Sequence, residues 1–422
     1  MRRKISEHDK TVLRKLAQRQ AEISGLAINK EKIEMWRKLN SLEKVRPMVW
    51  INPHQIPWNE IGIESQLETS HPFSKELELS IKKRLYMWDN LRTDMVMDDK
   101  LYSLLVIELG NFGLTENSDT IFAPGSESIA SHHYERQIQT EHDVEKIKTP
   151  EVKLNKELTE YNYHLMLDIF KDIIPVEKRG QPGFWFAPWD ILTTWWGGQE
   201  LLMDMALRPE LLKLAISRLT DAYLQMLKRY EDMNLLSLNS INYNFGNGTG
   251  GLGYTNELPQ NNFDPNHIHP KDMWGSAAAQ IFSEVSPKMH KEFATDYEIK
   301  WLKLFGLNYY GCCEPLHKKI DIIKEIPNLR KISISPWADI EEAAKAIEDK
   351  YVFSYKSNPA IFAYPDWDSS KVYSELNLAL STISGYGCNI EVILKDVSTI
   401  TQQPQKLMDW AHVAMEIVEN FV

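Results

Sequence analysis

The chain of 422 residues contains only three cysteines, which is too few for a disulfide framework. It also lacks an apolar run of the roughly 18 residues that a membrane-spanning helix needs. The first twenty residues are charged and contain no apolar segment of the kind found in secretory signals. These absences predict a cytoplasmic protein with no membrane partner, whose cysteines remain free thiols.

Positive charge is scarce as well, because 48 lysines and arginines face 59 acidic residues and the net charge is −11. A protein that grips a nucleic-acid backbone needs the opposite balance, so we expect no nucleic-acid partner. No glycine-rich phosphate turn follows an early strand, and the glycine-rich segment 246–253 lacks the Gly-Lys-Ser/Thr ending of a P-loop. This composition is compatible with an enzyme that acts on a small molecule.

The last third of the chain alternates between strand and helix patterns. Its apolar runs predict strands at 307–312, 331–335, 351–355 and 389–394, and helical periodicity follows at 316–325, 340–348, 369–384 and 405–420. Four such units with short connections favour parallel strands joined by crossover helices.

Upstream segments can supply the rest of a closed barrel. We expect strands at 95–97, 104–109, 184–186 and 235–243, and helices at 155–171, 200–207 and 209–234. The sum predicts an α/β protein, a (β/α)8 TIM-like barrel over residues 94–422 with a helical extension over 1–93. Within that extension, residues 46–58 predict a short strand and a proline-broken loop, and residues 76–90 predict a helix. The charged first 45 residues are typical of a surface helix pair or of a contact between subunits, as in a homodimer.

In barrels of this kind the site lies at the carboxyl ends of the strands. The residues that follow the four predicted strands are therefore candidates: Cys312, Cys313, Glu314, Ser335, Lys356, Lys395 and Asp396. Asn242 and Asn244 follow an upstream strand and are candidates for substrate binding, as is Lys356. Cys388 lies at the other end of its strand, about 20 Å away at 3.3 Å per residue, so we expect it to be a small buried group and no partner of Cys312.

The stretch NYYGCCEPLHK, residues 308–318, concentrates reactive side chains. Thiolates are zinc ligands or nucleophiles. Because neighbours on a strand point to opposite faces, we expect one of Cys312 and Cys313 to face the barrel mouth. Glu314 would be a second ligand from the same strand end, and Asp396, Glu257 or a histidine would have to come from elsewhere as the third. The alternative is a partly buried cysteine beside a glutamate that caps the next helix, with His317 exposed in its first turn.

Two further clusters leave alternatives open. His267 and His269 are spaced to ligate a metal, but a loop position with no third ligand nearby favours exposed polar residues. The tryptophan-rich segment 184–198 suits either a substrate pocket or plain core, and Trp195 and Trp196 are its candidates for substrate binding.

The order of three segments suggests a family. These are WGSAAAQIFSEVSPKMHKEF (274–293), interpreted as one long helix, then YYGCCE, then VFSYKSNPA. The chain resembles the uroporphyrinogen decarboxylase-like superfamily of barrels over 94–422. That superfamily includes cobalamin-dependent methyltransferases.

Two departures from the family pattern indicate which branch of the superfamily the chain resembles more. The stretch VWINPHQIPW has no arginine where the decarboxylases carry an Arg-rich grip for substrate carboxylates. The methyltransferase branch holds zinc with an HxC pair and a later cysteine. Here Tyr310-Gly311-Cys312 stands in place of HxC, and the later position falls near Lys395 and Asp396.

The resemblance implies a methyltransferase that moves a methyl group from a small methylated substrate, such as an aryl methyl ether or amine, to a corrinoid on a separate protein. No cobalamin-binding DxHxxG segment is present in this chain. Glu314, Asp396 and Lys395 would be catalytic, Tyr310 would contact substrate, and Cys312, Cys313 and Glu314 would hold zinc. The alternatives are a lyase or hydrolase that pairs Glu314 with Glu257 or Asp396, and a non-catalytic binding barrel.

Overall fold

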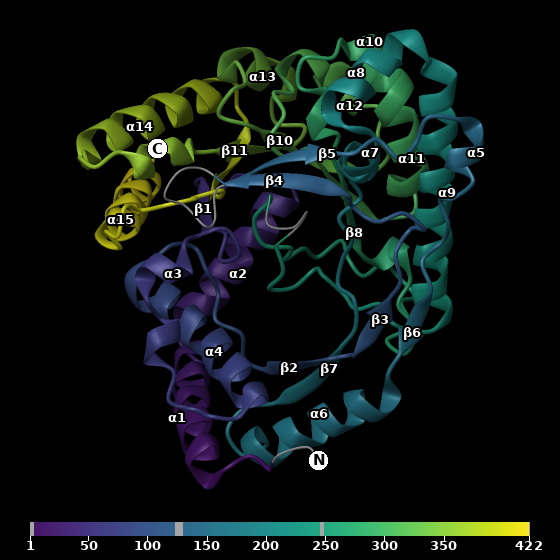
Figure 1. The fold of residues 1–422 in the computed structure, drawn as a ribbon. Helices are drawn as coiled ribbons and strands as arrows, with labels where there is room; N and C mark the ends of the chain where they lie inside the picture. Colours follow the sequence, from purple (N-terminus) through teal and green to yellow (C-terminus); the bar gives the residue numbers. More distant parts are fainter. Residues whose placement is uncertain (1–3, 123–129, 245–248, 422) are drawn as a thin grey trace.

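The computed structural model describes all residues except 1–3, 123–129, 245–248 and 422, so part of the glycine-rich segment 246–253 lies outside the described residues. The protein is an α/β protein with a parallel sheet and an amino-terminal helical region (Figure 1). The main sheet has the order β1-β12-β11-β10-β9-β8, and every adjacent pair is parallel. Its strands are β1 (Met48–Ile51), β8 (Trp274–Ala277), β9 (Leu307–Tyr310), β10 (Leu329–Ile334), β11 (Val352–Lys356) and β12 (Asn389–Leu394).

The four predicted strand–helix units of the last third are confirmed. Helices α12 (Ile320–Ile323), α13 (Ile340–Ile347), α14 (Ser369–Gly385) and α15 (Gln405–Glu419) follow β9 to β12 in turn. Asp339 and Asp368 begin α13 and α14 as side-chain caps, accepting hydrogen bonds from Glu342 N and Ser370 N. The parallel order brings the carboxyl ends of all four strands to one edge.

Strands β10 and β11 each have a largely polar face and a largely apolar face. Lys331 and Ser333 on β10 lie on the same face as Ser354 and Lys356 on β11, whereas residues such as Ile332 and Phe353 alternate with them. All of these side chains are buried. The polar row therefore lines the interior, and the apolar row packs against other elements.

The rest of the predicted barrel is less regular. Strand β2 (Leu101–Leu104) pairs in parallel with β7 (Val176–Arg179), and isolated parallel bridges join Gln181 to Leu236 and Phe186 to Ala277. In Figure 1, β7, β8 and the main sheet lie around one central region. Across the described ranges these are pairs and single bridges, so the closure of eight strands stays a prediction.

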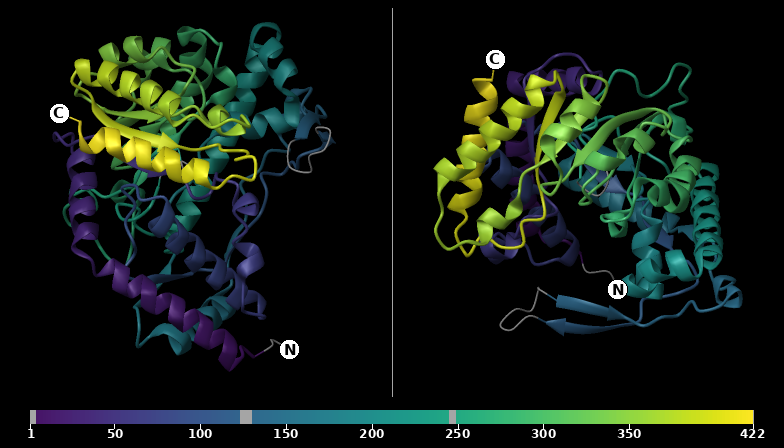
Figure 2. Two further views of the ribbon diagram at one scale, coloured as in Figure 1. Left: turned by 90° about the vertical axis from the view of Figure 1, so that its left-hand side faces the viewer. Right: turned by 90° about the horizontal axis from the view of Figure 1, so that it is seen from above.

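The remaining elements complete the chain. The helices are α1 (Glu7–Ser24), α2 (Ala27–Asn40), α3 (Trp58–Ile61), α4 (Pro72–Asn90), α5 (Glu141–Val144), α6 (Lys156–Phe170), α7 (Pro188–Trp196), α8 (Gly198–Leu207) and α9 (Pro209–Asp232). The further strands are β3 (Ile107–Leu109), β4 (Ser118–Phe122), β5 (Ala130–Tyr134) and β6 (Val152–Leu154). The β4–β5 hairpin stands out from the body (Figure 2). No helix within the described ranges is long and apolar enough to cross a membrane.

The amino-terminal helices do more than cover the surface. Trp36 of α2 is fully buried, and its Nε1 donates a hydrogen bond to the Asp94 carbonyl at 2.9 Å. Strand β1 falls within residues 1–93, yet it pairs with β12 as part of the main sheet. Part of the predicted extension therefore contributes to the core, and the division of the chain at residue 94 stays a prediction.

The interpretation of 274–293 as one long helix is wrong. Trp274–Ala277 is strand β8, and α10 (Pro287–His290), a π-helical turn (Lys291–Thr295) and α11 (Asp296–Leu302) follow only after a short 3-10 helix. Every residue of β8 is buried, as expected for a strand of a parallel sheet whose faces are covered. Ser286 caps α10 through Met289 N, and Pro287 takes its first turn. Residues 95–97, expected as a strand, form none.

An ion pair lies inside the sheet. Lys331 of β10 and Glu391 of β12 are both fully buried, and their Nζ and Oε2 atoms are 2.7 Å apart. The Lys331 Nζ also lies 5.7 Å from the ring centroids of Trp36 and of Trp274. The Gly251 amide donates to Glu391 Oε1 at 3.3 Å. The pair is therefore enclosed by aromatic rings and by backbone.

Removal of one partner alone should be costly. We expect Glu391→Gln or Lys331→Met each to lower the free energy of unfolding by about 3–5 kcal/mol, because the other charge stays buried without compensation. The double variant Lys331→Met/Glu391→Leu should recover most of that loss. Thermal unfolding followed by circular dichroism measures these free energies. A loss in the double variant equal to the sum of the two single losses would contradict the prediction.

Candidate functional site

The carboxyl ends of β9 to β12 enclose a cavity of about 320 Å³. Residues following each of the four strands line it: Cys312, Cys313, Pro336, Trp337, Lys356, Ser357, Asn358, Pro359, Ala360, Ala363, Lys395, Asp396, Ser398 and Thr399. Five of the predicted site residues meet here, namely Cys312, Cys313, Lys356, Lys395 and Asp396. Their common position follows from the parallel register of the strands.

Both cysteines face this cavity, contrary to the expectation that only one would. The reason is Gly311, which has a φ of +96° and ends β9 with a turn that interrupts the alternation of side chains. A Cβ atom at Gly311 would lie 2.5 Å from Leu316 Cδ1, so the turn has no room for a larger residue. The sulfur atoms of Cys312 and Cys313 are 3.4 Å apart.

Lys395 bridges the two sulfur atoms. Its Nζ lies 3.2 Å from Cys312 Sγ, 3.4 Å from Cys313 Sγ and 2.9 Å from Asp396 Oδ2. Lys395 is buried, whereas the Asp396 side chain is 41% exposed. One ammonium group is thus shared between two sulfur atoms and a carboxylate at the cavity wall.

The sharing gives the two thiols opposite character. The hydrogen bond from Cys312 and the positive charge of Lys395 lower the pKa of Cys313 in spite of its burial. The same hydrogen bond, together with burial, raises the pKa of Cys312. Burial opposes the charge of Lys395, but the two sulfur atoms and Asp396 raise its pKa above the ordinary lysine value. The arrangement therefore makes Cys313 the more acidic of the two thiols and favours the ammonium form of Lys395.

Lys356 lies deeper, at the end of β11, and is 1% exposed. Its Nζ donates to Tyr309 Oη at 2.8 Å, to Ser354 Oγ at 2.7 Å and to the Ser354 carbonyl at 3.2 Å. Burial lowers the pKa of Lys356 to about 7 although Glu391 favours its charged form. This amine can therefore both hold and release a proton near neutral pH. Tyr309 and Ser354, which position it, were not predicted from the sequence.

Glu314 takes a different place from the one expected. Its side chain is fully buried and is not among the residues that line the cavity. Its Oε2 accepts a hydrogen bond from the Cys312 amide at 3.0 Å, which holds the turn after β9. Burial raises the pKa of Glu314. His317, expected to be exposed, begins the 3-10 helix His317–Lys319 with a side chain only 15% exposed.

The predicted zinc ligands Cys312, Cys313 and Glu314 do not form a three-ligand group. Within the described ranges, the one group of at least three His, Cys, Asp or Glu ligands is Glu231, His267 and His269, at the other end of the sheet. The donor set Cys312, Cys313 and Glu314 therefore does not fit a zinc ion as these side chains lie. Cys388, next to the first residue of β12, is buried and far along the strand from Lys395, as expected.

Three predicted substrate contacts lie in the core. Tyr310 is fully buried and points away from the cavity, where its Oη donates to Glu298 Oε2 at 2.8 Å and lies 2.8 Å from His290 Nε2. Trp195 and Trp196 belong to α7 and are 2% and 0% exposed. Alternation along β9 explains the first case, because Tyr309 takes the inward position.

Asn242 and Asn244 line a second cavity, of about 520 Å³, beside the end of β1. Its wall also holds Arg84, His54 and Asp98, which the sequence analysis did not select. Burial raises the pKa of Asp98 to about 6. Arg84, His54 and Asp98 follow none of the four strands β9 to β12, so the rule that located the first cavity could not find them.

The proposed pairing of Glu314 with Glu257 is wrong. Glu257 binds Arg330 with Oε2 2.8 Å from Nη2, and Arg330 stands at the start of β10. Glu314 follows the end of the neighbouring strand. The two carboxyl groups therefore lie at opposite ends of the sheet.

Comparisons with known proteins add a resemblance of fold. No family model and no curated protein matches the chain. Among solved structures, the chain is similar to a methyltransferase from Methanosarcina mazei, with a TM-score of 0.49 and 10% sequence identity over 91% of this chain and 98% of that one. A likeness of this degree assigns no activity, substrate or cofactor.

The lowered pKa of Cys313 should be detectable by alkylation. We expect iodoacetamide to modify Cys313 faster than Cys312 or Cys388, since burial raises the pKa of Cys388 to about 12. Lys395→Met should slow the modification of Cys313 about tenfold for each pKa unit that the cation contributes. Peptide mass spectrometry of the reduced protein measures the rates, with Cys388 as internal control. An unchanged rate in Lys395→Met would contradict the assignment.

Proposed function

We propose that the chain is an enzyme that removes a methyl group from a small methylated substrate in the cavity at the ends of β9 to β12. The acceptor would be a corrinoid carried by a separate protein. The observation that carries the proposal is the convergence of Cys313, Lys395 and Lys356 on one cavity at the carboxyl edge of the sheet. The alternatives with Glu314 as acid or base are less favoured, because Glu314 does not line that cavity.

The size of the cavity supports a small substrate. A volume of about 320 Å³ is at the lower end of the range of ligand pockets. It suits an aryl methyl ether or a methylamine, and it is too small for a corrin macrocycle. The acceptor would therefore have to meet the substrate at the rim, which is consistent with delivery by a partner protein.

The reaction needs a proton at the leaving atom. When the methyl carbon passes to the acceptor, the carbon–oxygen or carbon–nitrogen bond breaks and its electron pair stays on the heteroatom. Lys356, with a pKa of about 7, can donate a proton to that atom and regain it from solvent. Lys356 rather than Glu314 is the proposed acid, because Lys356 lines the cavity and Glu314 does not. Corrinoid, when its carrier binds, would supply the nucleophile for the methyl carbon.

Lys395 and Cys313 shape the field around the substrate. The ammonium group of Lys395 is fixed by Cys312, Cys313 and Asp396 and so needs no reorganisation during the reaction. Trp337 lines the cavity and is 69% exposed, so it forms an apolar part of the rim. An exposed tryptophan beside a site is a feature of protein–protein contacts, and it supports a partner that docks over the mouth.

The proposal predicts a distinct dependence on pH. Turnover should fall about tenfold per unit above pH 7, because the protonated form of Lys356 is the active one and its pKa is about 7. Lys356→Met should lower kcat by about 10²–10⁴-fold and remove that limb of the profile. The assay is the absorbance change of a Co(I) corrinoid protein mixed with the enzyme and a panel of methylated ethers and amines.

A matched control is Lys319→Met. Lys319 is also buried, but its Nζ bonds to the Ser283 carbonyl at 3.1 Å and does not line the cavity. The pH profile of turnover by Lys319→Met should keep the wild-type shape. Absence of methyl–cobalt formation with every substrate would count against the methyltransferase, and an unaltered profile in Lys356→Met would count against Lys356 as the acid.

A further inference from the structure

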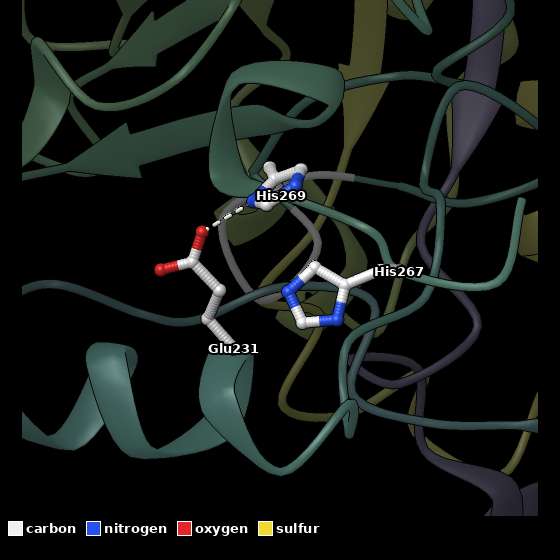
Figure 3. A group of neighbouring side chains, drawn as sticks. All are labelled: Glu231, His267 and His269. Atoms are coloured by element: carbon white, nitrogen blue, oxygen red, sulfur yellow. Dashed lines mark hydrogen bonds and ion pairs between the residues drawn. The ribbon is translucent and has the colours of Figure 1, made fainter. Parts of the chain in front are cut away.

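We propose that Glu231, His267 and His269 bind a divalent ion of the zinc class at the amino end of β8 (Figure 3). Glu231 lies in the last turn of α9, and the two histidines lie in the loop that leads to the 3-10 helix Pro270–Asp272 and β8. The proposed function involves none of these residues. The site is also at the opposite end of the sheet from Cys312 and Lys395.

The ligand atoms are already close together. One atom from each residue lies within 4.8 Å of the other two, and His269 Nδ1 is 2.6 Å from Glu231 Oε1. The ring centroids of His267 and His269 are 4.6 Å apart. A tetrahedral zinc ion with bonds of about 2.0–2.1 Å needs its ligands roughly 3.3 Å apart. Small shifts of these partly buried side chains would therefore complete the site, with the His269–Glu231 pair opening slightly.

The backbone around the histidines is fixed. The His269 amide donates to Oδ2 of the fully buried Asp272 at 3.3 Å, and the His267 amide donates to the Asp264 carbonyl at 3.1 Å. Asn234, just after α9, donates from Nδ2 to the Asn266 carbonyl at 2.6 Å. These hydrogen bonds join the loop to the end of α9 without using the metal-binding atoms. Metal binding would therefore lose little conformational entropy.

The donor types select the ion. Two imidazoles and one carboxylate suit zinc and neighbouring transition metals, whereas calcium and magnesium prefer oxygen ligands alone. The side chains of His269 and Glu231 are 37% and 18% exposed, so solvent can reach the ion. A cavity of about 350 Å³ borders them, between the end of α9 and Leu304. Three protein ligands and one open position result, with room for water or a small anion.

A bound ion would replace the contact between Lys228 and Glu231. Its Nζ lies 3.6 Å from Glu231 Oε2 and also 2.5 Å from Asp232 Oδ1. Because Lys228 has Asp232 as a second partner, Glu231 can turn to a metal without leaving that lysine uncompensated. Binding would join the loop before β8 to α9 more firmly than the present hydrogen bonds do.

The test uses the full chain with any affinity tag removed. Equilibrium dialysis against Zn²⁺ and elemental analysis should give about one zinc per chain, as a three-ligand site predicts. His267→Ala, His269→Ala and Glu231→Gln should each lose it, with folding checked by circular dichroism. His142→Ala is the matched control, because His142 and Glu145 form an exposed pair 3.1 Å apart with no third ligand in their described surroundings. It should bind zinc as the wild type does.

A second measurement separates this site from the thiols. Co²⁺ bound to imidazole and carboxylate gives no sulfur-to-metal charge-transfer band, whereas Co²⁺ bound to Cys312 or Cys313 does. We expect the band to be absent and the zinc to persist in Cys312→Ser/Cys313→Ser. Zinc that disappears in the double cysteine variant but stays in the histidine variants would overturn the proposal, as would no binding by the wild-type chain. Either result leaves the proposed methyl transfer to be tested separately.

Discussion

The structure depends on how three buried lysines are compensated. Lys331 on β10, Lys356 at the end of β11 and Lys395 just after β12 are at most 4% exposed, and Glu391 is the fully buried carboxylate among them. A buried charge is costly unless it is paired, so each lysine has a separate solution. Lys331 takes Glu391, Lys395 takes two sulfur atoms and Asp396, and Lys356 relies on neutral oxygens. The low pKa of Lys356 and the lowered pKa of Cys313 are both consequences of this distribution.

Much of the carboxyl-terminal half could be predicted from the sequence. The strands β9 to β12 are short apolar runs between helical periodicities, and the rule that parallel strands end at one edge located Cys312, Cys313, Lys356, Lys395 and Asp396. What the pattern could not give was direction. The conformation of Gly311 turned both cysteines toward the cavity, and alternation along β9 put Tyr309 inside and Tyr310 outside.

Other features depend on contacts between distant segments. Glu231 and His267 are far apart in the chain, and no pattern in the sequence indicates that the end of α9 brings a carboxylate beside the two histidines. The prediction of one helix over 274–293 failed because the buried strand Trp274–Ala277 is too short to show a periodicity that differs from that of the helix after it. Trp36 reaches the core from a charged helix whose composition is that of a surface element.

The closed floor of the cavity bears on the order in which molecules could bind and leave. Beneath Lys356 the interior is filled by Tyr309, Lys331 and Trp36, none of which is exposed to solvent. On the solvent side the lining includes Trp337, which is 69% exposed, so among the described residues the open side of the cavity lies toward this rim. If a macromolecule covers that rim during turnover, the small molecule beneath must arrive before it and depart after it. A compulsory order of binding and release would follow from such a cover, although no single residue of the site encodes it.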